Sequence, residues 1–261
     1  MAFRDNSRLI TSASDSIIGG EGFPGISYAG IDASAFTVAD YDVYRQRITG
    51  FGSDDTLITS RPILDGNSDG FIELNDASYI RVNFGYVQDE TVERDIVQIF
   101  GDEYSVTALR NLGEKGGAYV YADARTITNL TDRYGVAAVI EGDVGNDALD
   151  MGSGSKMLLV DNGLGLNLGG DRINNFGDDD LLVFTRKIYD RNGDGVIQFS
   201  KNGVLDISGS MGPKASDPVR SPGGQIQFLD PEITSLELVR SEIIEGIAYY
   251  LYGTEYYSLA N

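Results

Sequence analysis

The 261-residue chain contains no cysteine, no histidine and no tryptophan. The lack of cysteine excludes disulfides, thiol nucleophiles and thiolate metal sites. The lack of histidine excludes Ser-His-Asp catalysis, Cys-His catalysis and the usual catalytic zinc site. Because these absences remove most hydrolase mechanisms, we favour a protein that is not an enzyme. Catalysis by carboxylate, lysine, tyrosine or serine side chains remains open, and the catalytic alternative is a glycosidase or lyase that works with two carboxylates.

Basic residues are also scarce, since 20 Lys and Arg face 40 Asp and Glu and give a formal charge of −20. Nucleic acids and anionic membrane surfaces repel such a chain, so we expect neither as a partner. Bound cations such as calcium would offset the repulsion among the acidic residues. Alternatively, the net negative charge serves to keep a secreted protein soluble. No apolar run approaches the roughly 20 residues of a membrane-spanning helix, so we expect no membrane insertion.

The first residues, MAFRDNSRLITSASDS, lack the apolar core of a cleaved signal peptide. We therefore expect either a cytoplasmic protein or export by a route that needs no such peptide. The remaining composition favours strands and turns over helices, because glycine (33), tyrosine (15), valine, isoleucine and threonine are abundant.

An internal duplication organises the chain. Residues 48–72 read ITGFGSDDTLITSRPILDGNSDGFI, and residues 173–197 read INNFGDDDLLVFTRKIYDRNGDGVI. The two segments align without a gap at an offset of 125, as from Phe51 to Phe176. Chance does not produce this many matches, so we infer a repeated structural unit. Asp15 to Gly22 also resembles Asp147 to Gly154, at an offset of 132.

Each copy ends in D-x-N-x-D-G-x-I, the acidic half of a calcium loop. Carboxylate, amide and main-chain oxygens at alternate positions suit calcium, and the glycine permits the sharp turn. The first loop offers a residue at every ligand position of a twelve-residue loop, with the carbonyl at the seventh: Asp65, Asn67, Asp69, Phe71, Glu73 and Asp76. Aspartate at the last position resembles the dockerin-type loop. The alternative is a hairpin that is stabilised by Asx turns and binds no metal.

The second loop offers a shorter set: Asp190, Asn192, Asp194, the carbonyl of Val196, and Gln198. Lys201 stands at its twelfth position and cannot bind a cation, so another ligand such as Asp206 must complete the site. The acidic groups Asp54-Asp55 and Asp178 to Asp180 precede a strand-like run in each copy. They either face water or form a second ion site, with Asp55 and Asp180 as ligands.

From Gly142 a nine-residue period appears: GDVGNDALD, MGSGSKMLL, VDNGLGLNL and GGDRINNFG. Such a period predicts a short turn and a short strand, repeated so that successive strands stack. A glycine-rich loop with accidental spacing is the alternative. With the later segments DRINNFGDDDLLVFT and YDRNGDGVIQF, this stretch resembles the RTX, or haemolysin-type, calcium-binding repeat family. The resemblance implies a parallel β-roll with Asp147 as a calcium ligand, and type I-like secretion without a cleaved signal peptide.

We thus expect a mainly β fold of duplicated β-roll, β-solenoid-like or β-sandwich units with calcium-binding loops. The expected division is a first unit over residues 1–85, an intervening β segment over 86–140, a second unit over 141–212 and a tyrosine-rich β tail over 213–261. The tyrosines of the tail would pack in the core or form an assembly surface.

The function that these features favour is a secreted calcium-binding structural protein. It would associate with itself into an extracellular filament, surface layer or matrix. The alternative is a calcium-dependent adhesin or carbohydrate-binding module at the cell surface.

Overall fold

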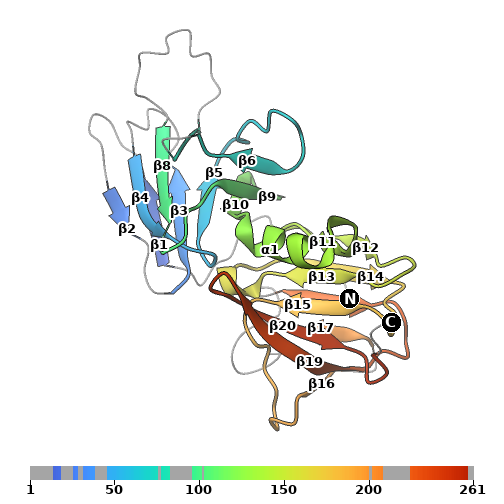
Figure 1. Cartoon of the computed structure of the whole chain (residues 1–261). Coiled ribbons are helices and arrows are strands. Elements are labelled where there is room, and N and C mark those ends of the chain that lie inside the picture. Colours follow the sequence, from blue (N-terminus) through green and yellow to red (C-terminus); the bar gives the residue numbers. More distant parts are fainter. Residues whose placement is uncertain are drawn as a thin grey trace. The chain divides into compact units, whose positions relative to one another are not determined.

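The computed structural model describes residues 14–18, 26–28, 32–38, 46–75, 78–82, 96–101, 103–199, 202–207 and 224–257. Within these residues the fold is mainly β, with twenty strands and one α-helix (Figure 1). The chain divides into two compact units, Met1–Arg125 and Thr126–Asn261. No helix of the described residues is long and apolar enough to cross a membrane.

The first unit contains two sheets. The six-stranded sheet has the order β1-β3-β5-β10-β9-β6, and the four-stranded sheet has the order β2-β4-β8-β7. The strands are β1 (Ser14–Ile18), β2 (Ile26–Tyr28), β3 (Ser34–Val38), β4 (Gln46–Phe51), β5 (Thr56–Thr59), β6 (Phe71–Glu73), β7 (Tyr79–Arg81), β8 (Ile96–Gly101), β9 (Ala108–Lys115) and β10 (Ala118–Asp123).

The second unit also has a six-stranded sheet, β11-β13-β15-β20-β19-β16, and a four-stranded sheet, β12-β14-β18-β17. Its first element is α1 (Arg125–Tyr134), of which Arg125 is the last residue of the first unit, and it contains the short 3-10 helices η1 (Val136–Ala138) and η2 (Asn162–Leu164). Its strands are β11 (Val139–Glu141), β12 (Ala148–Asp150), β13 (Met157–Val160), β14 (Gly170–Asn174), β15 (Leu181–Phe184), β16 (Val196–Gln198), β17 (Val204–Asp206), β18 (Gln225–Phe228), β19 (Ser235–Ile244) and β20 (Ile247–Gly253).

The two strand orders are identical when ten is added to each strand number of the first unit. The duplication therefore extends far beyond the aligned segments 48–72 and 173–197. The expected four-part division is corrected, because β8, β9 and β10 complete the sheets of the first unit and β18, β19 and β20 complete those of the second. Residues 86–140 are thus not a separate intervening segment, and residues 213–261 are not a separate tail.

The matching topology also corrects the offset of 132. Asp15 lies within β1, whose counterpart is β11, whereas Asp147 directly precedes β12. Since β1 begins at residue 14 and β11 at residue 139, the offset here is 139 − 14 = 125, as in the acidic loops. The similarity of the two glycine-rich stretches therefore does not reflect equivalent positions in the units.

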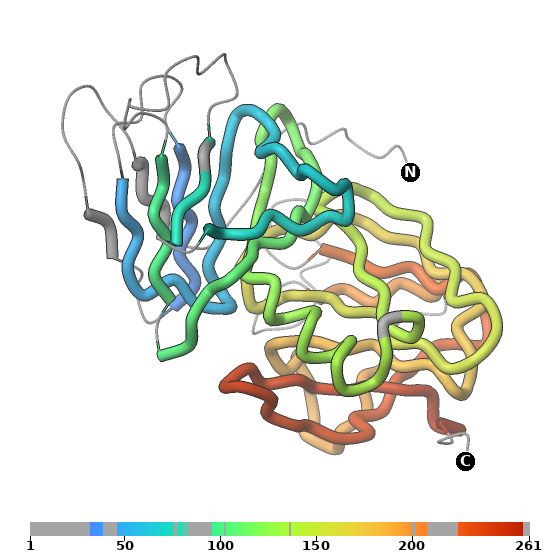
Figure 2. The backbone as a smooth tube through the Cα atoms, turned by 45° about the horizontal axis from the view of Figure 1, so that its top comes forward, coloured from blue at the N-terminus to red at the C-terminus, as the bar shows by residue number. Residues whose placement is uncertain are grey.

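In the first half of each unit the chain alternates between the two sheets, and strands of the same sheet pair in parallel. Figure 2 shows these successive turns of the second unit lying side by side. The strands β11, β12 and β13 begin at residues 139, 148 and 157, which is the predicted nine-residue spacing. The spacing is then lost: β14 and β15 begin at residues 170 and 181, and Met157 pairs with Leu181, 24 residues later.

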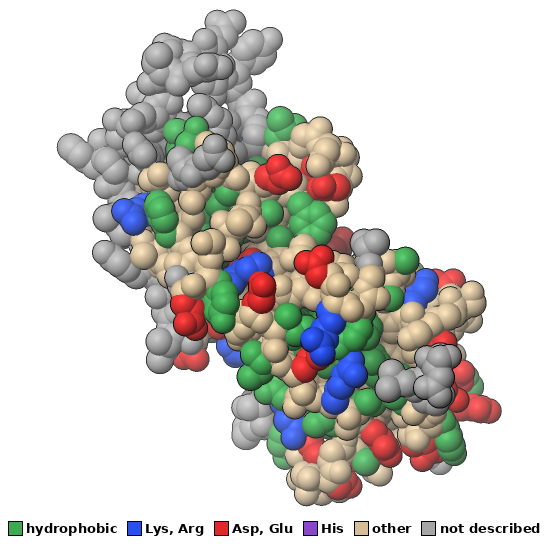
Figure 3. Space-filling model, viewed as in Figure 1, with side chains coloured by type: hydrophobic (Ala, Val, Ile, Leu, Met, Phe, Trp, Pro, Cys, Tyr) green, Lys and Arg blue, Asp and Glu red, His purple; other side chains and the backbone are tan. Residues whose placement is uncertain are grey.

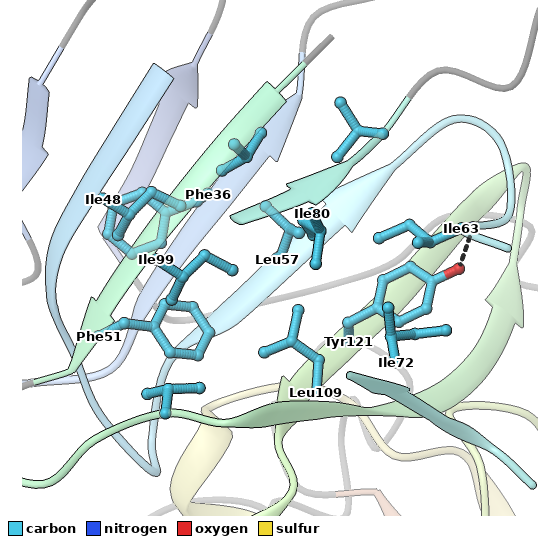
Figure 4. Close-up of a cluster of buried hydrophobic side chains, with 13 residues drawn as sticks. Phe36, Ile48, Phe51, Leu57, Ile63, Ile72, Ile80, Ile99, Leu109 and Tyr121 are labelled. Carbon is cyan, nitrogen blue, oxygen red and sulfur yellow. Dashed lines mark hydrogen bonds between the residues drawn. The ribbon is translucent and has the colours of Figure 1, made fainter. Parts of the chain in front are cut away.

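The core of the first unit is a cluster of buried apolar side chains. Figure 4 shows it, with Tyr121 of β10 at one side of the cluster. Its members are Phe36, Ile48, Phe51, Leu57, Ile63, Ile72, Ile80, Val82, Val97, Ile99, Val106, Leu109 and Tyr121. Two members of the cluster, Ile63 and Ile72, stand before and after the acidic part of the loop between β5 and β6. Their burial therefore holds both ends of this loop against the core.

Helix α1 packs on the second unit. Ile127, Leu130 and Tyr134 recur at helical spacing and contact a buried cluster that includes Leu159, Val183 and Tyr249. Gly135 directly follows the helix; its φ of 98° suits glycine, and its N–H bonds to the carbonyl of Thr131 at 2.8 Å.

Two tyrosines of the tyrosine-rich tail lie in the interior of the second unit. Tyr249 and Tyr252 are fully buried, and Tyr252 meets Phe184 edge to face. The core-packing interpretation is therefore confirmed for these two tyrosines, whereas Tyr256 is exposed.

Backbone segments of neighbouring turns approach closely where glycines stack. A Cβ atom on Gly169, whose φ is 100°, would lie 1.4 Å from the carbonyl oxygen of Gly145. A Cβ on Gly224 would lie 2.4 Å from the carbonyl oxygen of Gly169. Only glycine permits this approach, and the glycines at these turns therefore have a structural function.

Candidate metal centre

The first acidic loop joins β5 to β6 and is organised by Asp65. Its Oδ1 atom accepts the backbone N–H of Ser68 at 2.7 Å, and its Oδ2 atom accepts that of Gly70 at 2.8 Å. These bonds, the Gly70 bond above all, lower the pKa of Asp65 below its usual value, so the carboxylate is ionised at neutral pH. A positive φ at Ser68 (60°) and Gly70 (87°) lets the chain turn around it.

The next two loop residues continue the same arrangement. Asn67 Nδ2 donates to Asp69 Oδ2 at 2.9 Å, and Asp69 Oδ1 accepts the backbone N–H of Phe71 at 2.9 Å. The side chains of Asp65, Asn67 and Asp69 are thus held in one short segment, and Asn67 and Asp69 are exposed. The three residues assigned to the first, third and fifth positions are linked within one hydrogen-bonded turn.

The second loop, between β15 and β16, repeats this pattern bond for bond. Asp190 accepts the N–H of Gly193 at 2.8 Å and that of Gly195 at 2.7 Å. Asn192 Nδ2 donates to Asp194 Oδ2 at 2.7 Å, and Asp194 Oδ1 accepts the N–H of Val196 at 2.8 Å. The Gly195 bond is again the main cause that lowers the pKa of Asp190. Two different local sequences therefore fold into one loop geometry.

The main-chain carbonyls assigned to the seventh position lie on edge strands, because β6 and β16 each end their sheet. On either side of β6, the carbonyl of Gly70 accepts the N–H of Asn111, and the N–H of Leu74 bonds to the carbonyl of Thr107. Since alternate residues of a strand bond to the same neighbour, the carbonyl of Phe71 faces the open edge.

The same holds in β16. There the carbonyl of Gly195 accepts the N–H of Leu238, and Phe199 bonds to Thr234. The carbonyl of Val196 therefore also faces the open edge of its sheet, on the side where Asp194 accepts the Val196 N–H.

The outer ligand positions differ between the loops. Glu73 ends β6 and Gln198 ends β16, and both side chains are exposed. A glutamate at the ninth position can hold a ligating water with its charge, whereas a glutamine offers only a neutral carbonyl. The twelfth positions, Asp76 and Lys201, lie outside the described residues.

The sequence patterns did not reveal that a buried tyrosine lies beside the start of each acidic loop. Tyr121 is fully buried and its hydroxyl oxygen accepts the backbone N–H of Ile63 at 2.7 Å, two residues before Asp65 (Figure 4). Tyr252 is its counterpart in β20 and its hydroxyl lies near the backbone amide of Ile188, two residues before Asp190, but makes no hydrogen bond of ordinary geometry. Burial raises the pKa of Tyr252 to about 12, so it is neutral. The weak signal was AYVY at 118–121 beside AYYLY at 248–252.

Asp55 and Asp180 hold neighbouring backbone segments together. Asp55 accepts the N–H groups of Ser34 and Gly52, each at 2.8 Å, and Asp180 accepts those of Lys156 and Gly177, also at 2.8 Å. Both carboxyl groups are buried, and this burial raises the pKa of Asp55 to about 7 and raises that of Asp180. Each carboxyl oxygen already has a backbone donor, so these contacts favour a structural function over the expected second ion site.

Asp147 also bonds within and between turns. Its Oδ2 atom accepts the N–H of Asp143 at 2.7 Å, and its own N–H donates to Asp171 Oδ1 at 2.9 Å. Further bonds link residues 24 apart, such as Asn146 Oδ1 to the N–H of Gly170 at 2.7 Å. The structure thus brings Asp147 together with Asp143 and Asp171.

The donor set of the two loops fits calcium in chemical type, because every candidate ligand is a hard oxygen atom. Within the described residues no three Asp, Glu, His or Cys side chains gather as a metal-binding group. A loop of this kind does not require such a group, since amide and main-chain oxygens and water complete its ligands. Acidic side chains are scattered over the face shown in Figure 3 and do not form one patch there.

Comparisons of the chain with protein-family models, with curated proteins and with solved structures gave no match.

Proposed function

We propose that this protein is an extracellular calcium-binding structural protein in which each unit holds one calcium ion in its acidic loop. The observation that carries the proposal is the repeated hydrogen-bond pattern of Asp65, Asn67 and Asp69 in Asp190, Asn192 and Asp194. Hydrogen bonds from the backbone hold the first carboxylate of each loop in place before any ion binds, which lowers the ordering cost of binding.

Bound calcium would also offset part of the negative charge of the chain. With a formal net charge of −20, self-repulsion opposes the compact state, and two bound divalent cations reduce it. Each loop gathers two carboxylates within a few residues, so binding an ion there removes local repulsion as well. The native state is stabilised because a folded loop binds calcium more tightly than an unfolded one.

We propose further that the alternating parallel strands of each unit form a short β-roll, and that the RTX resemblance extends to export without a cleaved signal peptide. Self-assembly into a filament, surface layer or matrix is part of the proposal. Its support is the open sheets: β11 and β12, the first strands of the parallel stack, lie at sheet edges and offer backbone groups to a further strand.

Calorimetric titration with calcium tests the binding. We expect two ions per chain, one after Asp69→Asn or Asp194→Asn, and none after both substitutions, because charge at the fifth position contributes strongly to affinity. Asp132→Asn is the matched control, since it removes an exposed helical carboxylate outside both loops. Unchanged stoichiometry in the double variant would disprove the loop assignment.

Assembly is tested separately by electron microscopy and light scattering, with calcium and with a chelator. We expect ordered assemblies with calcium and their loss in the chelator. A monodisperse monomer under both conditions at high protein concentration would disprove the assembly part and leave the calcium sites standing.

An exposed apolar residue next to each loop favours a second candidate, a calcium-dependent adhesin or carbohydrate-binding module. Leu64 precedes Asp65 and Tyr189 precedes Asp190, and their exposed fractions are 70% and 43%. An aromatic ring beside a bound cation suits a sugar or a peptide ligand. Calcium-dependent binding to a glycan array that Tyr189→Ala abolishes, without formation of polymers, would favour this alternative.

A further inference from the structure

The fourth position of the two acidic loops differs in chemistry although its backbone conformation is the same. Ser68 occupies it in the first loop with a φ of 60°, and Gly193 occupies it in the second with a φ of 75°. The residue before it is asparagine in both, so the first loop contains Asn67-Ser68 and the second contains Asn192-Gly193. Because glycine has no Cβ, its backbone nitrogen is open to a neighbouring side chain.

The chain has two other Asn-Gly pairs, and in both the glycine is buried, whereas Gly193 is exposed. Asn162 donates to the carbonyl of Arg186 at 2.9 Å and accepts its N–H at 2.8 Å, and Gly163 is buried. Asn202 accepts the N–H of Val204 at 3.4 Å, and Gly203 is packed so tightly that a Cβ would lie 2.6 Å from the carbonyl oxygen of Phe228.

The pair in the second acidic loop is exposed at both residues. A Cβ on Gly193 would meet nothing within 4 Å. The side chain of Asn192 is held only by neighbours within its own loop, through the Nδ2 bond to Asp194 and the Oδ1 bond to the N–H of Asp194 at 3.3 Å. Asn192 can therefore rotate toward the following peptide without disturbing a strand or the core.

We propose that Asn192 is a site of spontaneous deamidation. The Gly193 nitrogen loses its proton to hydroxide and attacks Cγ of Asn192, forming an N–C bond. The Cγ–Nδ2 bond then breaks, and the nitrogen leaves as ammonia after taking a proton from water, which regenerates the hydroxide. Water opens the resulting five-membered succinimide at either carbonyl and yields aspartate or isoaspartate. The net reaction consumes one water and releases one ammonia.

Modification changes the second loop at its third position. Aspartate adds a carboxylate, whereas isoaspartate adds a methylene to the backbone and displaces the bonds of Asp190 and Asp194. On the proposed function, calcium slows the reaction because it engages the Asn192 side-chain oxygen and holds the loop. The calcium effect thus rests on the proposed function, but the deamidation does not.

The test incubates the full chain at mildly alkaline pH, with calcium or with a chelator, followed by peptide mapping with mass spectrometry. Deamidation adds about one dalton to the modified peptide. In the chelator we expect the peptide with Asn192 to convert several-fold faster than those with Asn67, Asn162 or Asn202, with both aspartate and isoaspartate as products.

Gly193→Ser is the matched control variant, because Ser68 shows that serine takes this backbone conformation in the other loop. We expect it to slow conversion to the rate at Asn67 while the circular dichroism spectrum is unchanged. Conversion at Asn192 no faster than at Asn67, or unaffected by Gly193→Ser, would overturn the proposal. Fast conversion that calcium does not slow would confirm the site and count against calcium binding by the second loop.

Discussion

The hydroxyl oxygen of Tyr121 accepts the backbone N–H of Ile63 at 2.7 Å inside the core of the first unit. This bond joins β10 to the residue that leads into the acidic loop, 58 positions earlier in the chain. Because Tyr121 is fully buried and Ile63 nearly so, the bond exchanges little with water. It therefore fixes the start of the loop to the core of the unit.

Tyr121→Phe should weaken this attachment without opening a cavity. The substitution leaves the Ile63 N–H without its partner, which costs about 1–3 kcal/mol of unfolding free energy. We expect the first loop to lose calcium affinity and the second to keep it. Calorimetric titration measures the first loop in the Asp194→Asn variant and the second loop in the Asp69→Asn variant.

Tyr252→Phe is the matched control, since Tyr252 occupies the same place in the second unit but its buried hydroxyl makes no hydrogen bond of ordinary geometry, so its loss should leave both loops unchanged. If Tyr121→Phe lowers the affinity of both loops equally, the effect is a general loss of stability and the anchoring argument is wrong.

The acidic loops could be predicted from sequence because their geometry is local. Five of the six bonds that organise each loop join residues two or three apart, and the sixth joins residues five apart. Spacing alone therefore placed Asp65, Asn67 and Asp69 together. The second copy lies at a constant offset of 125 residues, so the positions of Asp65, Asn67 and Asp69 transferred directly to the second loop.

The sheets were less predictable because their pairings are distant. β5 pairs with β10 across some sixty residues, as Leu57 with Tyr121, and no local signal reports this. The repeat was visible only where the loop lengths agree, so the expected units were too short and omitted β8 to β10 and β18 to β20. The nine-residue period does not continue after β13, because the later turns are longer. The polar bonds between turns join residues 24 apart, as in Asp147 to Asp171.

Gly169→Ala should destabilise the second unit severely. The new Cβ would lie 1.4 Å from the carbonyl oxygen of Gly145, and the φ of 100° is strained for alanine. We expect a loss of about 4 kcal/mol or more in chemical unfolding.

Gly154→Ala is the matched control, because Gly154 also has a positive φ (84°) but nothing within 4 Å of its Cβ position. It should cost only about 1–2 kcal/mol. Similar losses in the two variants would contradict the close stacking of these turns.

Calcium should raise the melting temperature of the chain. Ligand that binds only the folded state at about 100 times its dissociation constant adds about 2.7 kcal/mol per site. We expect a calcium-dependent shift in the wild type, a smaller one in Asp69→Asn, and none when Asp194→Asn is added. Equal melting curves and circular dichroism spectra with calcium and with a chelator would refute the account of both loops.

Asp55 should make stability depend on pH in a direction opposite to that of the loop carboxylates. Its pKa is raised from 3.8 to about 7 by burial, so the folded state favours the protonated form. The stabilisation is complete below about pH 4 and is lost as the pH rises through 7. For Asp65 and Asp190, whose pKa values are lowered, it is present at neutral pH and is lost on acidification.

The contribution of Asp55 can be isolated by comparing Asp55→Asn with the wild type at fixed calcium. Asparagine does not titrate, and its NH₂ group takes the place of one of the two carboxyl oxygens that accept backbone N–H groups. The variant should therefore be the less stable of the two at pH 5. Between pH 5 and 8 the difference in unfolding free energy should shift in favour of the variant by roughly 2 to 3 kcal/mol. Urea unfolding across this range measures it, with Asp132→Asn as an exposed control. A difference that stays constant with pH would show that Asp55 is ionised in the folded protein, and a cation beside it would then explain the burial of its charge.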